Sequence, residues 1–213
     1  MKAVAINGSP RRGGNTQIML EKVLEQLQVA GWSTDYIQVG GKPVRGCIAC
    51  FKCFENRDRR CSIGKDGLND HLERIYSADA LILGSPTYFA DVTPELKAFI
   101  DRVGFVGLAN GGLLSGKIGA AVVAVRRGGG THVFDTINHM FLLSSMVVPG
   151  STYWNLGVGR DRGQVLEDAE GMRNMEHLGK TICWLGQAIA SAPAPFPAPQ
   201  YRLDLESEPP VAS

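Results

Sequence analysis

Apolar positions along the first 190 residues follow two alternating patterns. Short runs rich in apolar and β-branched residues are typical of buried strands in a parallel sheet. Five such runs occur, at Lys2–Ile6, Ser33–Val39, Asp79–Gly84, Ile118–Val125 and Met146–Val148. Between and after them lie amphipathic segments whose apolar residues recur with the spacing of a helix face. Helices are therefore expected at Asn15–Ala30, Asp66–Ser77, Thr93 to about Arg102, Thr131–Ser144 and Glu167–Ala190.

Local start signals support two of these helices. Asp66 is expected to cap the second helix. Thr93-Pro94-Glu95 places Thr at the N-cap, Pro at the first helical position and an acid in the first turn. Strands that alternate with helices predict an α/β fold: a doubly wound five-stranded parallel sheet with helices on both faces. Such sheets bind ligands beyond the carboxyl ends of their strands, so residues that follow the first, third and fourth runs are site candidates.

Two segments depart from this pattern. Residues 41–65 show no clear period and hold four of the five cysteines, which indicates an insertion. Residues 191–213 hold six of the eleven prolines, and the run Pro193–Pro199 is typical of a polyproline II tail. The chain is therefore expected to be one domain over residues 1–190, with a Cys-rich insertion at 41–65 and a Pro-rich tail at 191–213.

Composition narrows the function classes. The chain is 44% hydrophobic and 20% charged with a net charge of +1, so no global field favours nucleic acid or an anionic membrane. No apolar run approaches a membrane span, and the N-terminus does not resemble a signal peptide. We expect a cytoplasmic protein with reduced cysteines. In that compartment, clustered cysteines indicate metal binding or redox chemistry rather than a disulfide framework.

The segment after the first expected strand has the composition of a phosphate-binding loop. It reads Asn7-Gly8-Ser9-Pro10-Arg11-Arg12-Gly13-Gly14-Asn15-Thr16 and leads into a helix. Glycines allow close backbone approach, and the helix N-terminus supplies N–H donors. Ser9, Asn15 and Thr16 add side-chain donors, and Arg11 and Arg12 can add positive charge. A plain strand–helix turn with an Asn cap is the alternative. Rival motifs fail: no G-x-G-x-x-G follows the first strand, and Ile118 stands where the G-x-x-x-x-G-K run needs Ser or Thr.

Three loops in order carry a resemblance to a known family. Gly8-Ser9-Pro10-Arg11 with Gly14-Asn15-Thr16 resembles the FMN phosphate loop of the NAD(P)H-dependent FMN reductase group of flavodoxin-like proteins. The Gly-Ser-Pro-x-Tyr segment of that group has a counterpart in Gly84–Phe89, and its glycine-rich loop in Arg126–Thr131. The resemblance covers about residues 1–190. It implies a flavodoxin-like fold, an FMN cofactor, and a flavin site at a subunit interface in a homodimer or homotetramer.

The resemblance also implies the cofactor-binding residues. They are Ser9, Arg11, Gly14, Asn15, Thr16, Pro86, Thr87, Tyr88, Phe89, Arg126, Gly128, Gly129 and Gly130. The Pro86–Phe89 turn can supply aromatic walls, and the glycines can let N–H groups approach the ring. Arg126 or Arg127 can stabilise charge on the reduced flavin. Ordinary loop packing for Tyr88 and Phe89, and a solvated arginine, are the alternatives. Trp154 is expected in the core, with a place at the edge of the ring as the alternative. His132 is expected to be a solvated residue at a helix start, with a proton donor as the alternative.

The cysteine spacing favours an iron–sulfur cluster. Cys47-x2-Cys50-x2-Cys53-x7-Cys61 suits [4Fe–4S] better than zinc, which prefers two separated C-x2-C pairs. It resembles the compact motif of iron–sulfur flavoproteins, a branch of the same group. Free or redox-active thiols and a zinc site stay open as alternatives. Cys183 is expected to be a small core residue.

Three hypotheses of function follow. The first is an FMN oxidoreductase that takes electrons from NAD(P)H or a protein donor and passes them to a quinone, a flavin or another small molecule. The hydride chemistry belongs to the flavin N5, so no catalytic side chain is required. The second is an electron-transfer iron–sulfur flavoprotein with FMN and [4Fe–4S] but no small-molecule substrate. The third is a flavin-free phosphate-binding or thiol-redox module.

Overall fold

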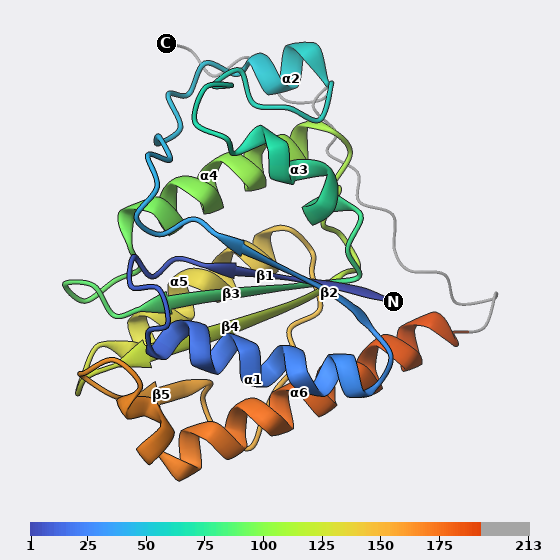
Figure 1. Ribbon diagram of the computed structural model, residues 1–213. Coiled ribbons are helices and arrows are strands. Elements are labelled where there is room, and N and C mark those ends of the chain that lie inside the picture. Colours follow the sequence, from blue (N-terminus) through green and yellow to red (C-terminus); the bar gives the residue numbers. More distant parts are fainter. Residues whose placement is uncertain (193–213) are drawn as a thin grey trace.

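The protein is described by a computed structural model over residues 1–192, so the Pro193–Pro199 run and the rest of the predicted tail lie outside the described residues. Five strands form one sheet in which every pairing is parallel (Figure 1). They are β1 (Lys2–Asn7), β2 (Ser33–Gln38), β3 (Ala80–Pro86), β4 (Ile118–Val125) and β5 (Leu156–Val158). The spatial order is β2-β1-β3-β4-β5, which puts the switch point between β1 and β3.

Helices cover both faces of this sheet (Figure 1). On one face, α1 (Asn15–Val29) and α6 (Ala169–Ala190) enclose one buried apolar cluster. On the other, α3 (Asn69–Tyr76), α4 (Pro94–Ala109) and α5 (Gly130–Leu143) enclose a second. The predicted doubly wound α/β fold is confirmed. None of the helices between residues 1 and 192 has the length and apolar character needed to cross a membrane.

The central strands are buried on both faces, which explains their continuous apolar runs. Residues 3–6 of β1 are fully buried, and all eight residues of β4 are buried. A strand covered by helices on both sides gains by placing an apolar residue at every position, and this is why no alternating pattern is present. The carboxyl ends of β1, β3 and β4 therefore emerge from the core at one rigid edge.

The predicted fifth strand is wrong. The true edge strand is Leu156–Val158, which pairs with Val123–Val125 at the carboxyl end of β4. The predicted segment contributes only a single bridge, from Val147 to Ile118 at the opposite end of β4. Both segments are short and apolar, and both lie along the open edge of β4, but only the second makes a ladder of three residue pairs.

Of the two predicted helix caps, the one at Asp66 is wrong and the one at Thr93 is confirmed. Asp66 does not cap α3, which begins at Asn69, because the Asp66 carboxylate is paired with Arg102. Thr93 caps α4 as predicted: its Oγ1 accepts a hydrogen bond from Leu96 N (3.4 Å) and donates one to Gly8 O (2.7 Å). That helix continues to Ala109, so Arg102 lies inside it. Within the Cys-rich segment a short helix, α2 (Lys52–Asn56), was not predicted.

Candidate functional site

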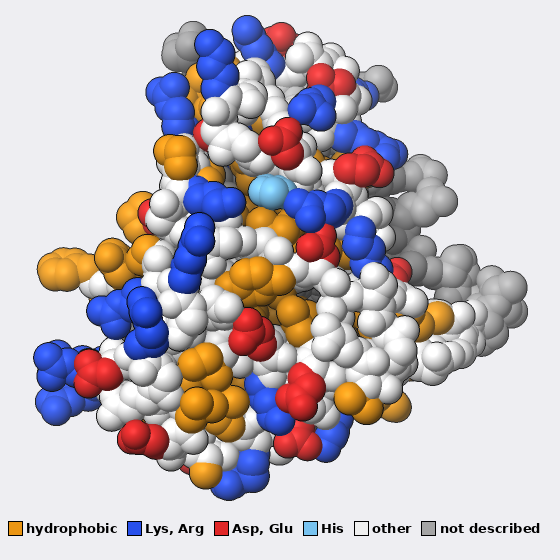
Figure 2. Space-filling view, in the orientation of Figure 1, with side chains coloured by type: hydrophobic (Ala, Val, Ile, Leu, Met, Phe, Trp, Pro, Cys, Tyr) orange, Lys and Arg blue, Asp and Glu red, His pale blue; other side chains and the backbone are white. Residues whose placement is uncertain are grey.

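The loops that follow β1, β3, β4 and β5 meet around one pocket of about 310 Å³, within the usual size range of small-molecule sites. We call it the switch-point pocket. Its lining consists of Ser9, Pro10, Arg11, Asn15, Thr16, Pro86, Thr87, Tyr88, Ala124, Arg126, Gly159 and Arg160. Figure 2 shows Lys and Arg side chains gathered at the edge of the molecule where these loops lie in Figure 1.

The N-terminus of α1 opens into this pocket. Its N-cap is Gly14, and no side chain within the described residues caps it. The first N–H groups of a helix have no partner inside the helix, so these donors suit a phosphate. Ser9 and Thr16 are buried, and Ser9 Oγ accepts a hydrogen bond from Arg11 N (3.2 Å). Arg11 Nη1 donates to Arg160 O (3.2 Å), which joins the loops after β1 and β5.

Two features of the lining indicate that the pocket suits a ligand. The Thr87 hydroxyl oxygen is buried, yet within residues 1–192 it has no hydrogen-bond partner. Buried polar groups are nearly always satisfied, so a bound group is the natural partner. Gly159 has no room for a side chain, because a Cβ there would lie 2.7 Å from Val165 N and 2.8 Å from Asn15 Nδ2.

The structure brings most of the predicted flavin residues together. Eight of them line the switch-point pocket: Ser9, Arg11, Asn15, Thr16, Pro86, Thr87, Tyr88 and Arg126. Five do not line it: Gly14, Phe89, Gly128, Gly129 and Gly130. Gly14 still matters indirectly, because a Cβ there would stand 2.9 Å from Arg11 O. Sequence reasoning missed Gly159 and Arg160, which follow the true fifth strand; the Leu156-Gly157-Val158 run before them was the available signal.

The loop after β3 ends in an exposed hydrophobic tip. Phe89 and Ala90 both adopt left-handed backbone conformations, at φ 47° and 76°. The Phe89 side chain is fully exposed, and Figure 2 shows hydrophobic side chains projecting at the edge where this loop lies in Figure 1. Beside the tip, His132 Nε2 lies 3.5 Å from Asp91 Oδ2, with both side chains largely exposed. Trp154 is half-exposed and packs on Tyr153, so its expected core position is wrong.

A second pocket joins the four clustered cysteines, and we call it the cysteine pocket. Cys47, Cys50, Cys53 and Cys61 all line it, together with apolar side chains that include Phe51 and Phe105. Within the described residues all cysteines are free of disulfides, and no three or more Cys, His, Asp or Glu side chains are gathered closely enough to hold a metal ion. The sulfurs thus share a pocket without converging on one point. The fifth cysteine, Cys183, packs partly buried against the core under α6.

Three of these sulfurs take part in hydrogen bonds. Cys61 Sγ accepts from Arg102 Nε (3.3 Å), Cys50 Sγ lies 3.1 Å from Ser62 Oγ, and Cys47 Sγ accepts from the N–H of Ala49 (3.5 Å). The bond with Ser62 lowers the pKa of Cys50, whereas burial raises the pKa of Cys53.

The backbone around these cysteines is strained. Ala49 and Phe51 adopt left-handed conformations, at φ 50° and 53°, that side chains of L-residues disfavour. Such strain persists where the surroundings enforce it, and it concentrates at functional sites. Left-handed residues alternating with others can also turn N–H groups toward one point, a feature of many iron–sulfur sites. The donor set and the backbone therefore suit an anionic cluster, although the sulfurs must move closer to hold one.

Comparison with known proteins assigns the family. The family model described as NADPH-dependent FMN reductase matches residues 1–161. The chain belongs to the NADPH-dependent FMN reductase family. Membership of this family supports the assignment of the chain as an FMN oxidoreductase. The predicted group, FMN reductases and iron–sulfur flavoproteins, is confirmed.

Three relatives place the chain within this family. An iron–sulfur flavoprotein of Methanocaldococcus jannaschii is 35% identical over 189 residues, covering 85% of this chain and 95% of its own. An iron–sulfur flavoprotein of Methanosarcina thermophila is 29% identical over 185 residues, covering 86% and 94%. The solved WrbA-like flavodoxin of Agrobacterium tumefaciens aligns with a TM-score of 0.63 at 13% identity, covering 88% and 98%. This last likeness confirms the flavodoxin-like fold.

Proposed function

We propose that the protein is an FMN-dependent oxidoreductase that takes electrons from NAD(P)H or a protein donor and passes them to a small-molecule acceptor such as a quinone or a flavin. The observation that carries this proposal is the uncapped N-terminus of α1, which opens into a pocket whose Thr87 hydroxyl has no partner among the described residues. Family membership supports FMN as the ligand.

The residues divide into two roles. Ser9, Asn15 and Thr16, with the first N–H groups of α1, bind the phosphate, and Arg11 neutralises its charge. Pro86–Tyr88 and Arg126 orient the ring and keep water from one side of it. FMN, when bound, supplies the hydride and electron chemistry, so the chain contributes position and electrostatics rather than a proton-transfer side chain.

A second candidate function rests on the cysteine pocket. We propose that Cys47, Cys50, Cys53 and Cys61 hold a [4Fe–4S] cluster, which would make the protein an electron-transfer iron–sulfur flavoprotein. Support comes from the shared pocket and from relatives named iron–sulfur flavoproteins. Cys47 is exposed and Cys50, Cys53 and Cys61 are only partly buried, so local movement of the segment can bring the sulfurs together.

Chemical analysis of protein purified without oxygen tests both proposals. The expected result is about one FMN with about four irons and four sulfides per chain. Full FMN without iron or sulfide would leave a plain FMN oxidoreductase, and protein without flavin would refute both. Cys50→Ala should lose iron and keep FMN, whereas the matched variant Cys183→Ala should keep both. Anaerobic bleaching of the flavin by NADH or NADPH would identify the donor.

We also propose that the protein assembles as a homodimer or homotetramer. The fully exposed Phe89, on a strained loop beside the switch-point pocket, supports contact with a second copy there. Light scattering should give twice or four times the chain mass of 22.9 kDa, and Phe89→Ser should weaken the assembly. A monomer at micromolar concentration would contradict the proposal.

A further inference from the structure

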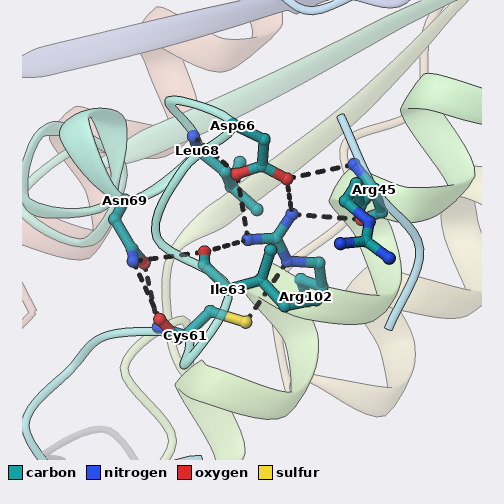
Figure 3. Close-up of polar contacts among 7 residues, drawn as sticks. All are labelled: Arg45, Cys61, Ile63, Asp66, Leu68, Asn69 and Arg102. Carbon is teal, nitrogen blue, oxygen red and sulfur yellow. Dashed lines mark hydrogen bonds and ion pairs between the residues drawn. The ribbon is translucent and has the colours of Figure 1, made fainter. Parts of the chain in front are cut away.

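Arg102 is the largest fully buried side chain among the described residues. It lies inside α4, and its guanidinium faces the Cys-rich segment (Figure 3). Its side chain is 0% exposed, and that of its partner Asp66 is 5% exposed. Burial alone would raise the pKa of the Asp66 carboxyl, but hydrogen bonds from Arg102 and from Arg45 N hold it below its usual value. The pair is therefore ionised at neutral pH.

Each of the five N–H donors of this guanidinium has an acceptor. Nη1 donates to Arg45 O (3.0 Å) and to Asp66 Oδ2, and Nη2 donates to Ile63 O (2.7 Å) and Asp66 Oδ1 (3.2 Å). The fifth donor, Nε, points at Cys61 Sγ at 3.3 Å. Four acceptors are strong oxygen acceptors. The fifth is weak as a thiol and becomes strong only as the thiolate that a metal ligand provides.

The same network fixes the position of Cys61. Arg45 precedes the first cysteine, while Ile63 and Asp66 follow the last, so Arg102 joins both ends of the Cys-rich segment (Figure 3). Asn69 at the start of α3 holds the Cys61 backbone from the other side. Its Oδ1 accepts from Cys61 N (2.9 Å), and its Nδ2 donates to Cys61 O (2.8 Å).

We propose that Arg102 is a positioning residue that holds Cys61 for the cluster and, through the Nε–H···Sγ bond, makes the cluster easier to reduce. The inference rests on the proposed [4Fe–4S] site. Hydrogen bonds to ligand sulfurs stabilise the more negative, reduced state, and they are among the factors that set cluster potentials. Asp66 counterbalances the guanidinium charge, so it tempers this effect.

Two substitutions that should shift the reduction potential of the cluster in opposite directions test the proposal, in protein loaded with FMN and cluster. Arg102→Lys keeps the charge but removes the Nε donor, and it should make cluster reduction about tenfold less favourable, a fall of about 59 mV for one electron. Asp66→Asn removes the negative charge that balances the guanidinium, so it should raise the potential and make cluster reduction severalfold more favourable. Arg74→Lys is the matched control, since Arg74 pairs with Asp35 (2.8 Å) at a half-exposed site and should leave the potential unchanged.

Potentials are read by anaerobic redox titration of the cluster's electron paramagnetic resonance signal, with iron and FMN measured on each sample. Opposite shifts in the two variants support the proposal. Full clusters with unchanged potentials, or shifts of the same sign, overturn it. Loss of the cluster from both variants, while FMN stays bound and Arg74→Lys keeps its cluster, supports the positioning role of the network. If only one variant keeps its cluster, the sign of its shift decides. Wild-type protein without iron would instead refute the cluster itself.

Discussion

The two pockets of this protein are organised in different ways. The switch-point pocket lies at the ends of buried strands, and its Ser9 and Thr16 are themselves buried. The cysteine pocket is lined mostly by a segment in which no residue from 41 to 67 is buried. Its two ends are tied together by Arg102, which reaches out of α4. The sheet thus preorganises the first pocket, whereas the second depends on side-chain contacts with α3 and α4, in which Arg102 makes most of the hydrogen bonds.

This difference has a consequence for binding. A phosphate can dock on the α1 N-terminus with little rearrangement, because the core has already fixed the donors. A cluster must draw four sulfurs together, so part of its binding energy goes into ordering the segment. We therefore expect the cysteine pocket to be more sensitive to loss of Arg102 than the switch-point pocket is to loss of any one of its lining side chains.

The largest expected effect comes from removing Arg102. Arg102→Ala leaves the Asp66 carboxylate buried without its partner, a change that typically costs about 3–5 kcal/mol. The free energy of unfolding in urea should fall by that amount, and limited proteolysis should cut within residues 41–65. The control is Arg74→Ala, whose half-exposed pair should cost about 1 kcal/mol or less. Equal costs for the two substitutions would show that the Arg102–Asp66 pair contributes no more than a half-exposed pair and does not organise the cysteine pocket.

The same contrast explains what the sequence could predict. The continuous apolar runs of β1 and β4 follow directly from burial on both faces, and strand ends of a doubly wound sheet meet by topology. Ser9, Thr87 and Arg126 could therefore be brought together by reasoning alone, although they lie far apart in the chain. The failure at the fifth strand is also physical, since three-residue segments carry no period, and pairing with β4 decides between them.

Arg102 had no signal of its own in the sequence. It stood at the expected end of a helix, where arginines are common and usually solvated. Its partners Cys61 and Asp66 are 41 and 36 residues away, and only the packing of α4 against the Cys-rich segment brings them together. Asp66 was misjudged for the same reason, because a helix cap and a buried ion pair leave the same local pattern.

A smaller effect is expected at the phosphate-binding end of the switch-point pocket. Ser9→Ala combined with Asn15→Ala removes two polar side chains at the uncapped N-terminus of α1. Hydrogen bonds to a charged group contribute about 1.5 kcal/mol or more each, so FMN affinity should fall by roughly 2–3 kcal/mol, or about 30- to 150-fold. Fluorescence titration of the flavin-free protein with FMN measures this. Unchanged affinity would show that the FMN phosphate does not bind at this loop.

A more local test compares two glycines near the same pocket. In Gly159→Ala the new Cβ would stand 2.7 Å from Val165 N, so the backbone must shift, at a cost of roughly 1–3 kcal/mol. At Gly128 a Cβ would meet no atom within 4 Å. Gly159→Ala should therefore lower both the melting temperature and FMN affinity, while Gly128→Ala should change neither. If both variants behave alike, close packing after β5 does not shape the pocket.

The smallest effect is expected at His132, beside the exposed tip. Its Nε2 lies 3.5 Å from Asp91 Oδ2, and the two side chains are 64% and 46% exposed. Exposed pairs of this kind contribute about 0–1 kcal/mol, and His132 does not line the switch-point pocket. His132→Gln should thus leave FMN affinity and the rate of flavin reduction within about twofold of wild type at every pH from 6 to 8. A loss of rate that grows with pH in the wild type and vanishes in the variant would instead make His132 a proton donor. The chemistry would then extend from the buried strand ends to the exposed loop.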